Sequence, residues 1–507
     1  MLTDKEIMRL ANGSDVRGIA IEGVEGEAVN LTPEAANRIA TGFVKFLELH
    51  YEKSPSNLKV AVGHDSRITA DSLKNAVIEA LTVAGVKTFD CGLASTPAMF
   101  MSIVLPETNV DGSIMITASH LPFNRNGLKF FTKLGGVEHE NIMTILKNAC
   151  EAEEMHSSNV ELVEKINLID IYSVHLCKKI RKKLNNGDKP LSGMHIVVDA
   201  GNGAGGFFAS KVLEPLGADI SGSQFLEPDG HFPNHIPNPE NKEAMASIQK
   251  AVLDNHADLG LIFDTDVDRM SAVLSDGEEI CRNALIAMIA AILAPDYPHS
   301  TIVTDSVTSD ELTAFLENDL KLHHLRYMRG YRNVINKCIE LNLAGITSPL
   351  AIETSGHGAL RENYYLDDGA YLAVKLIIAA ANARKSGKDL SHLIDKLQYP
   401  AESGEFRFKI LDVENFHAYG SNVLEAFQSR AIDHKIKIAE PSFEGVRLIF
   451  EGDGKDGWAL LRMSLHDPNM PLNIESKHKG GVKKIAAEVK ALLGGFDKLD
   501  ISSLANI

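Results

Sequence analysis

The first part of the chain alternates short apolar runs with apolar positions at helical spacing. Thr32-Pro33-Glu34 predicts the start of a helix, because Thr can cap a helix and Pro suits its first position. Apolar residues then recur every three or four positions over 36–47, which indicates one buried helix face. Strands are predicted at 60–62, 86–89 and 113–116, with a helix over about 72–84 that ends at Gly85. This alternation predicts a largely parallel sheet buried between helices.

The same pattern begins again twice. A predicted strand at 195–198 leads into Asp199-Ala200-Gly201-Asn202-Gly203-Ala204-Gly205-Gly206 and then a helix, and a predicted strand at 301–304 is followed by Asp305-Ser306. Each restart predicts a further α/β unit. The charged and poorly periodic stretch 181–193 is predicted to be a linker.

After about residue 400 the pattern changes. Strands at 446–450 and 458–461 around Gly452-Asp453-Gly454 predict a hairpin, and 482–493 predicts a closing helix. At 507 residues the chain is too long for a single core. We therefore expect an α/β fold, with three related α/β domains that contain mixed sheets and a smaller α+β C-terminal domain. The expected domains are 1–155, 156–298, 299–400 and 401–507.

The charge balance excludes two classes of partner. With Lys+Arg 51 against Asp+Glu 68, the net charge is −17. Such a surface repels nucleic acid and anionic membranes, so an anionic ligand must bind in a local basic pocket. The five cysteines lie far apart, without the spacing of a disulfide framework or a zinc site, as is typical of a cytosolic protein. With no signal core or apolar run of membrane-spanning length, we expect a cytoplasmic protein, or an organellar one if a transit peptide is missing.

The strongest chemical signal is Asp264-Thr265-Asp266-Val267-Asp268-Arg269, directly after the apolar run 259–263. Three alternating carboxylates at a strand's end suit Mg²⁺, which binds a few carboxylates plus phosphate oxygens. An EF-hand is excluded, because Arg269 and Ser275 stand where Gly and Glu are needed. A solvated acidic turn is one alternative. A haloacid-dehalogenase-type phosphatase also uses strand-end aspartates but places them at its first strand, whereas here Asp266 lies mid-chain and Asp268 supplies a third carboxylate. Three like charges so close together repel one another unless a cation neutralises them.

Ser119 is the candidate to carry a phosphoryl group, whose oxygens would complete the Mg²⁺ shell. It follows a predicted strand in Thr117-Ala118-Ser119-His120-Leu121-Pro122. The Gly-x-Ser-x-Gly pattern of a nucleophile elbow is missing, and Pro122 with Asn124-Arg125-Asn126-Gly127 predicts a loop instead. Lys129 can return a positive charge to the serine. A Ser-His pair in a loop is by itself more often structural, so the interpretation depends on the other motifs.

Two further motifs also follow predicted strands. Glu353-Thr354-Ser355-Gly356-His357 supplies an acid, a hydroxyl and an imidazole, which suit vicinal sugar hydroxyls, although a plain turn is the alternative. In Arg462-Met463-Ser464, the guanidinium and the hydroxyl can bind a phosphate. Asp367-Asp368-Gly369 predicts the N-terminal cap of a helix over 370–381 rather than a second metal site.

With these motifs in this order, the chain resembles the α-D-phosphohexomutase superfamily, the phosphoglucomutase/phosphomannomutase enzymes, along essentially its whole length. The resemblance implies four domains around a central cleft, each contributing one loop. It also implies that a phosphoserine exchanges its phosphoryl group with a hexose phosphate through a hexose 1,6-bisphosphate, with Mg²⁺ as cofactor. The supporting matches are Ser14-Asp15-Val16-Arg17-Gly18, Val62-Gly63-His64-Asp65-Ser66-Arg67, Asp199-Ala200-Gly201-Asn202-Gly203 and Asp367-Asp368-Gly369.

The resemblance implies a role for each candidate residue. Either His120 or Lys129 would accept the proton of the sugar hydroxyl, and the sequence does not separate them. The implied catalytic residues are Ser119, His120, Lys129 and Arg17; the implied substrate-binding residues are Glu353, Ser355, His357, Arg269, Arg329, Arg462, Ser464 and His466; and the implied metal ligands are Ser119, Asp264, Asp266 and Asp268.

The chain departs from the family pattern in three places. Leu121 replaces the usual Asn of the serine loop. Met328 stands where the family often has a lysine, and Arg329 or Arg332 can supply the positive charge of that lysine. The family's Arg-x-Ser-Gly-Thr-Glu-Pro becomes Arg462-Met463-Ser464-Leu465-His466-Asp467-Pro468, and Pro471 replaces a second arginine. Losing Gly and Thr removes a backbone cradle for an anion. His466 can stand in as a donor, and we expect an altered grip on phosphate or an altered substrate choice.

We therefore expect a Mg²⁺-dependent mutase that interconverts the 1- and 6-phosphates of glucose, mannose or both, as a monomer or homodimer. One alternative is a phosphoglucosamine mutase. A second is a non-catalytic sugar-phosphate-binding relative, which the altered fourth loop suggests. A third is a metal-dependent phosphatase, in which water hydrolyses the phosphoserine.

Overall fold

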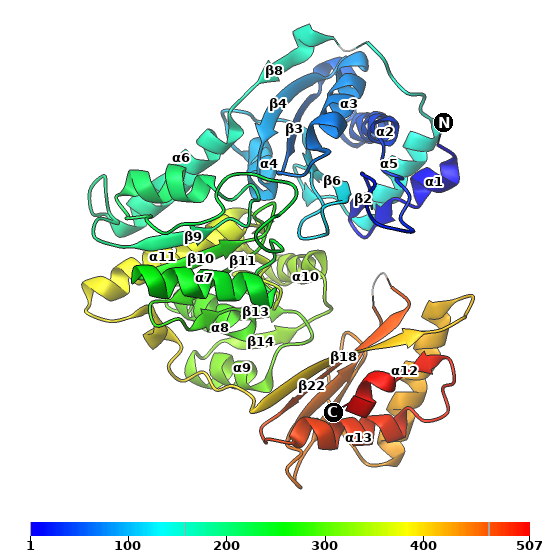
Figure 1. Ribbon diagram of the computed structural model, residues 1–507, viewed down its shortest axis with the longest axis vertical. Coiled ribbons are helices and arrows are strands. Elements are labelled where there is room, and N and C mark those ends of the chain that lie inside the picture. Colours follow the sequence, from blue (N-terminus) through cyan, green and yellow to red (C-terminus); the bar gives the residue numbers. More distant parts are fainter. Residues whose placement is uncertain (1, 158, 465–466, 507) are drawn as a thin grey trace. The chain divides into compact units, whose positions relative to one another are not determined.

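The computed structural model describes residues 2–157, 159–464 and 467–506 (Figure 1). The chain divides into two compact units. Unit 1 consists of Met1–Ile292 and Ser355–Leu393, and unit 2 consists of Leu293–Thr354 and Ile394–Ile507. In the described part of the chain, no helix combines the length and the apolar character that crossing a bilayer requires.

The N-terminal part of unit 1 is a mixed β-sheet with helices packed against it. Its elements are α1 (Asp4–Met8), β1 (Ala11–Asn12), β2 (Asp15–Ile19), α2 (Pro33–Tyr51), β3 (Lys59–His64), α3 (Ala70–Val83), β4 (Lys87–Leu93), α4 (Thr96–Val104), β5 (Gly112–Ile116), β6 (Arg125–Thr132), β7 (Gly135–Gly136), α5 (His139–Glu151) and β8 (Val163–Lys165). The strand order is β1-β2-β6-β5-β3-β4-β8, with β7 paired to β6. β3 is parallel to β4 and β5, whereas β6 is antiparallel to β2 and β5. The loop that carries Ser119 therefore joins two neighbouring antiparallel strands.

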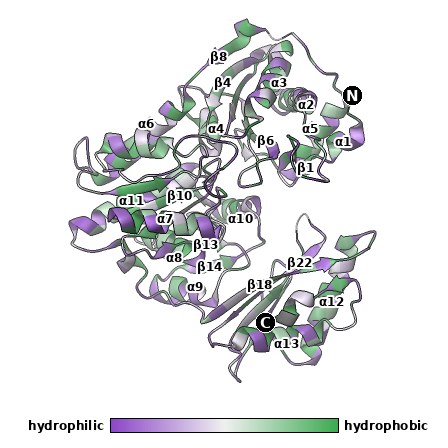
Figure 2. Cartoon of the chain, viewed as in Figure 1, coloured by the Kyte–Doolittle hydropathy of each residue, from purple (hydrophilic) through white to green (hydrophobic). Residues whose placement is uncertain are grey.

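Helix α2 begins where the sequence predicts. Thr32 accepts a hydrogen bond from Ala35 N at 3.2 Å, and Pro33 is the first helical residue. Its apolar face, which includes Phe43, belongs to one core with residues of β3, β5 and β6. Figure 2 shows hydrophobic and hydrophilic residues on the same helices, as expected where one helix face is buried.

The second part of unit 1 is built around a smaller mixed sheet. Its elements are α6 (Leu168–Leu184), β9 (Ile196–Asp199), the π-helix η3 (Phe208–Leu213), α7 (Lys242–Asn255), β10 (Leu259–Phe263), β11 (Met270–Leu274), β12 (Glu279–Ile280) and α8 (Arg282–Leu293), followed later in the chain by β16 (Gly358–Leu360), β17 (Leu366–Asp367) and α11 (Gly369–Lys385). β10 is parallel to β9 and antiparallel to β11. The aspartate motif is thus the loop of the β10–β11 hairpin, because Phe263 pairs with Met270.

One local prediction fails in this part of the chain, and another is confirmed. The linker predicted over 181–193 is wrong for its first four residues, which form the last turn of α6. Ile180 and Leu184 are buried there, and the lysine-rich surface of that turn hides the apolar periodicity. The helix predicted after Gly206 is confirmed at Phe208–Leu213, where it is π-helical.

Unit 2 contains three parallel strands of a mixed sheet, and an antiparallel sheet. Its elements are β13 (Thr301–Thr304), α9 (Asp310–Ala314), the π-helix η5 (Phe315–Asp319), β14 (His323–Arg326), α10 (Tyr331–Leu343), β15 (Leu350–Ile352), β18 (Glu402–Ile410), α12 (Phe416–Asp433), β19 (Lys437–Ile438), β20 (Val446–Phe450), β21 (Gly457–Leu461), β22 (Asn469–Ser476), α13 (Gly481–Leu492) and β23 (Leu499–Asp500). β13 is parallel to β14 and β15, and the C-terminal strands follow the order β19-β20-β21-β22-β18-β23. The predicted hairpin is confirmed as β20–β21. Helix α13 lies where the closing helix is predicted, but β23 follows it and pairs with β18. The predicted α/β class with mixed sheets is confirmed, and the four domain boundaries stay predictions.

Glu475 on β22 is a half-buried acid whose charge depends on pH. Trp458 Nε1 donates to Glu475 Oε2 at 3.0 Å, and the Arg447 guanidinium lies 3.6 Å from the centroid of the Trp458 ring. Burial, with the nearby charge of Glu311, raises the pKa of Glu475 from 4.5 to about 7. Above pH 7 the Glu475 carboxylate is therefore charged in the folded protein. This charge lowers the free energy of unfolding, because the carboxylate is better solvated in the unfolded chain.

We expect Glu475→Gln to stabilise the protein at pH 8 but not at pH 4.5. Glutamine keeps the acceptor for Trp458 Nε1 and removes the half-buried charge. The gain in unfolding free energy should grow as pH rises from 4.5 to 7, reaching at most about 3 kcal/mol. Thermal unfolding across this pH range measures it, with Glu425→Gln on an exposed position of α12 as the control. A gain independent of pH would contradict the assignment.

Candidate functional site

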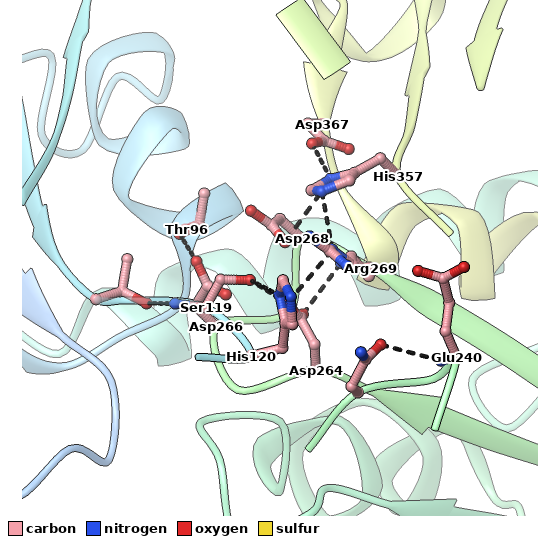
Figure 3. A network of polar contacts seen from close by, with 12 residues as sticks. Thr96, Ser119, His120, Glu240, Asp264, Asp266, Asp268, Arg269, His357 and Asp367 are labelled. Carbon is pink, nitrogen blue, oxygen red and sulfur yellow. Dashed lines mark hydrogen bonds and ion pairs between the residues drawn. The ribbon is translucent and has the colours of Figure 1, made fainter. Parts of the chain in front are cut away.

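The three aspartates of the β10–β11 loop lie together and are buried (Figure 3). One carboxylate oxygen from each lies within 4.8 Å of the others. Burial raises the pKa of Asp264 well above its ordinary value, and the charges of Asp268 and Asp266 raise it further. Asp266 Oδ1 and Asp268 Oδ1 are buried and have no hydrogen-bond partner among the described residues. Because such buried oxygens are costly without partners, the loop has both the ligands and the electrostatic need for a divalent cation such as Mg²⁺.

Ser119 lies beside this cluster. Its Oγ donates a hydrogen bond to Asp264 Oδ2 at 2.8 Å, although the two residues are 145 positions apart. Ser119 is 4% exposed, and its φ of 51° lies in the left-handed region, which non-glycine residues seldom adopt. Its backbone N donates to Thr117 Oγ1 at 2.8 Å. The structure therefore brings the N-terminal hydroxyl and the central acids together within unit 1.

Lys129 projects from β6 into the acidic cluster. Its Nζ donates to Asp266 Oδ2 at 3.1 Å and also to Asp268 Oδ2. Thr96 at the start of α4 donates a second hydrogen bond to Asp266 Oδ2, at 2.5 Å. Burial acts to raise the pKa of Asp268, but the positive charges of Lys129, His357 and Arg269 together outweigh it and lower that pKa. Lys129 and Thr96 therefore bind the Oδ2 atoms of Asp266 and Asp268. The Oδ1 atom of each of these two carboxylates remains available to a cation.

His120 lies beside the serine, and the charge of Arg17 acts on the His120 ring. His120 Nδ1 lies 3.4 Å from Ser119 Oγ. The charge of Arg269, burial and the charge of Arg17 lower the pKa of His120 well below its ordinary value, so the imidazole is neutral near pH 7. Arg17 on β2 donates from Nη2 to Asp15 Oδ2 at 2.7 Å.

His357 takes part in a chain of polar contacts within unit 1. Its Nε2 accepts a hydrogen bond from Arg269 Nε at 2.8 Å, and its Nδ1 pairs with Asp367 Oδ2. Because Nε2 is an acceptor, the ring proton lies on Nδ1 and faces Asp367. This chain orients Arg269, whose Nε lies 4.0 Å from Asp264 Oδ2. Ser355, the other unit 1 residue predicted to bind the sugar, is also buried.

In unit 2, the residues predicted to bind substrate are held by buried polar groups. Glu353 Oε1 accepts a hydrogen bond from Gly330 N at 2.6 Å, and Arg329 Nε lies 3.7 Å from Asp305 Oδ2. Asp305 Oδ2 also accepts a hydrogen bond from Thr354 Oγ1 at 2.7 Å. These contacts attach the loop that carries Arg329 to the ends of β13 and β15.

Glu444 connects Arg462 to the same loop. Its Oε2 accepts hydrogen bonds from Arg329 N at 3.0 Å and from Ser306 Oγ, and its Oε1 lies 3.5 Å from Arg462 Nη1. The predicted phosphate-binding arginine therefore has a carboxylate beside it in this structure.

The rest of the fourth motif is only partly described. Ser464 Oγ accepts a hydrogen bond from Asp467 N at 3.3 Å. His466, predicted to replace a donor of the family pattern, lies outside the described residues, as does Leu465.

Sequence reasoning missed three contributors to these sites. Thr96 and Glu444 lie outside the recognised motifs, and only their three-dimensional neighbours distinguish them. Asp367 was predicted to form a helix cap together with Asp368. Asp368 does cap α11, accepting a hydrogen bond from Tyr371 N at 2.8 Å, whereas Asp367 pairs with His357. The sequence did hold a signal for this second role. A helix cap needs only one acid, so the other of two adjacent acids at a helix start is available for a different contact.

Comparison with known proteins identifies the family. Models of the phosphoglucomutase/phosphomannomutase α/β/α domains I, II and III match residues 8–156, 172–277 and 282–399. The chain belongs to the phosphoglucomutase/phosphomannomutase family. It is therefore a mutase, an enzyme of the isomerase class.

Individual relatives match along most of the mutase. It is 28% identical to the phosphomannomutase/phosphoglucomutase of Pseudomonas syringae pv. tomato, over 86% of this chain and 88% of that one. It is 29% identical to the phosphoglucomutase/phosphomannomutase of Thermococcus kodakarensis, over 91% and 93%. A solved phosphoglucomutase/phosphomannomutase family protein from Burkholderia thailandensis shares the fold with a TM-score of 0.78, at 24% identity, over 98% of both chains.

Proposed function

We propose that this mutase interconverts the 1-phosphate and 6-phosphate of glucose, mannose or both, through a phosphoserine at Ser119 and a hexose 1,6-bisphosphate. The observation that carries the proposal is the hydrogen bond between Ser119 Oγ and Asp264 in the acidic cluster. A hydroxyl held beside a cation-binding group of acids suits phosphoryl transfer, in which positioning and charge stabilisation supply most of the catalysis.

The transfer step can be assigned to groups of unit 1. The bond between phosphorus and Ser119 Oγ breaks as a bond forms between phosphorus and the free hydroxyl oxygen of the hexose phosphate. The hydroxyl proton passes to a base, and Ser119 regains a phosphoryl group from the other end of the bisphosphate. Geometry favours His120 as this base, because a ring nitrogen lies 3.4 Å from Ser119 Oγ, whereas the ammonium of Lys129 is held by Asp266 and Asp268.

Ser119, Asp264, Asp266 and Asp268 would hold the Mg²⁺ ion. When bound, Mg²⁺ would neutralise negative charge on the transferring phosphoryl group. Lys129 contributes a fixed positive charge to the same cluster, and the chain of Asp367 and His357 holds Arg269 beside Asp264.

We assign recognition of the non-reacting phosphate to Arg462, Arg329 and Ser464, and recognition of the sugar to Glu353, Ser355 and His357. Guanidinium groups bind phosphate with good geometry and retain their charge at all relevant pH values. Glu444 holds Arg462 near the loop of Arg329 and would compete with the substrate phosphate for Arg462. This competition would offset part of the affinity for phosphate.

A single assay separates the proposal from its alternatives. The purified protein receives Mg²⁺, a trace of glucose 1,6-bisphosphate and, in parallel, glucose 1-phosphate, mannose 1-phosphate or glucosamine 1-phosphate. We expect the 6-phosphate of glucose, mannose or both to form. Release of free phosphate would indicate a phosphatase, conversion of glucosamine phosphate alone a phosphoglucosamine mutase, and binding without turnover a non-catalytic relative.

A further inference from the structure

Arg67 follows β3 in unit 1 and directs a buried guanidinium into the serine loop. The residue is 2% exposed. Its Nη1 donates to the carbonyl oxygens of Pro122 at 2.8 Å and Arg125 at 2.9 Å, and its Nη2 donates to those of Leu121 at 2.7 Å and Ser119. A guanidinium has four terminal N–H groups, so each can serve one of these carbonyls. One side chain thus binds three carbonyl groups of the loop between β5 and β6 and the carbonyl of Arg125, the first residue of β6.

Asp65 binds the same loop from its other side. Its Oδ2 accepts a hydrogen bond from Thr117 Oγ1 at 2.6 Å, and Thr117 Oγ1 in turn accepts one from Ser119 N. Asp65 also holds Arg67, since its Oδ1 accepts a hydrogen bond from Arg67 N at 3.0 Å and its Oδ2 lies 3.4 Å from Arg67 Nε. Both the N–H and the C=O of Ser119 are therefore fixed by this pair, which we name the Asp65–Arg67 clamp.

A second segment of unit 1 covers the clamp. The guanidinium carbon of Arg67 lies 5.4 Å from the centroid of the Phe232 ring. A Cβ at Gly230 would lie 2.6 Å from Ser66 O and 2.5 Å from Ile68 N, so only glycine permits this close approach. The cover excludes water from Arg67, which strengthens its hydrogen bonds to the carbonyls.

We propose that the Asp65–Arg67 clamp positions Ser119 for phosphoryl transfer. The left-handed backbone of Ser119 is unfavourable for serine, so surrounding contacts must hold it. By fixing the peptide groups on both sides of Ser119, the clamp fixes the direction of its Cα–Cβ bond, and hence the approach of Oγ to Asp264. Asp65 and Arg67 are positioning residues, and their role rests on the proposed function of Ser119.

The test compares Arg67→Lys with a matched change in the same part of the chain. Arg38 on α2 is also buried and also donates to carbonyls, those of Leu2, Ala149 and Cys150, but it holds no part of the serine loop. Lysine keeps the charge in both variants and cannot reproduce the forked geometry of arginine. The measurements are Tm with and without Mg²⁺, kcat and KM for glucose 1-phosphate, and the rate at which glucose 1,6-bisphosphate phosphorylates Ser119, followed by intact mass.

We expect Arg67→Lys to lower kcat and the rate of Ser119 phosphorylation by about 10²-fold, the usual order for a misplaced reacting group, with KM unchanged. The rise in Tm on adding Mg²⁺ should remain, because lysine keeps the positive charge at position 67 and the three carboxylates of the β10–β11 loop are unchanged. Arg38→Lys should lower Tm by a comparable amount and leave kcat at the wild-type value. If Arg67→Lys does not fold, Thr117→Val removes the link from Asp65 to Ser119 N and should show the same loss of kcat without a change in KM.

Wild-type kcat and phosphorylation rate in a folded Arg67→Lys protein would overturn the inference. An equal loss of kcat in Arg38→Lys would also overturn it, because lowered stability alone would then explain both variants. Failure of the wild-type protein to isomerise any hexose phosphate would refute the proposed function instead. In that case, comparing the rate of Ser119 phosphorylation between the wild-type protein and Arg67→Lys still tests whether the Asp65–Arg67 clamp positions Ser119. If Ser119 is never phosphorylated, both the proposed function and the clamp are refuted.

Discussion

Ser119→Ala should abolish isomerisation of hexose phosphates while leaving the fold intact. The proposed cycle passes every phosphoryl group through this oxygen, so the variant cannot form the phosphoenzyme. We expect kcat to fall by on the order of 10⁴-fold or more. The change removes one hydrogen bond, to Asp264, from a buried carboxylate, at a cost of about 1 to 3 kcal/mol in unfolding free energy. Coupled assay of glucose 6-phosphate formation and a thermal melt measure the two effects.

Ser113→Ala is the matched control for this prediction. Ser113 lies on β5, six residues before Ser119, is fully buried, and also donates one hydrogen bond, to Met99 O at 2.8 Å. Its loss should lower Tm by a similar amount and leave kcat unchanged. Turnover that persists in Ser119→Ala, or an equal loss of activity in Ser113→Ala, would remove Ser119 from the catalytic cycle.

Features set by neighbouring residues were predictable from the sequence. Helix α2 begins at Pro33 because Thr32 caps it, and the β20–β21 hairpin forms around a glycine-rich turn. The aspartates of the β10–β11 loop were recognisable as candidate cation ligands from their charge and alternation alone. In each case the information lies within a few residues, where periodicity, capping and turn chemistry act.

Features that depend on distant residues required the structure. Nothing near Glu444 indicates that its carboxylate binds the loop of Arg329, and nothing near Arg67 indicates that it holds four carbonyls of the segment 119–125. The proximity of Ser119 to the aspartates was expected from the chemistry of the two motifs and from the family resemblance, not from a pattern of neighbouring residues. Such contacts depend on which strands become neighbours, and a local pattern does not encode that choice. The linker predicted over 181–193 failed for a related reason. The lysines on the surface of α6 are visible in the local sequence, whereas the burial of Leu184 is not.

Removing Mg²⁺ should inactivate the enzyme, and adding Mg²⁺ back should restore its activity. In the Asp266→Asn variant, added Mg²⁺ should not restore activity. In the metal-free protein, burial and the charges of Asp268 and Asp266 raise the pKa of Asp264, so a bound cation relieves an unfavourable cluster. A ligand that binds only the folded state at 100 times its Kd adds about 2.7 kcal/mol to the unfolding free energy. We therefore expect Tm of the wild-type protein to rise on adding Mg²⁺ after chelation, with recovery of activity, and expect neither change in Asp266→Asn.

Asp199→Asn separates loss of metal binding from loss of a buried charge. Asp199 is a fully buried acid at the end of β9, in the same sheet, but it pairs with His235 at 3.0 Å and does not belong to the cluster. This control should lower Tm and still respond to Mg²⁺. Ser119→Ala should also keep its Tm response, because the three carboxylates remain, even though its activity is lost. A Tm response that survives in Asp266→Asn but disappears in Asp199→Asn would place the cation away from the β10–β11 loop and, with it, the proposed site of phosphoryl transfer.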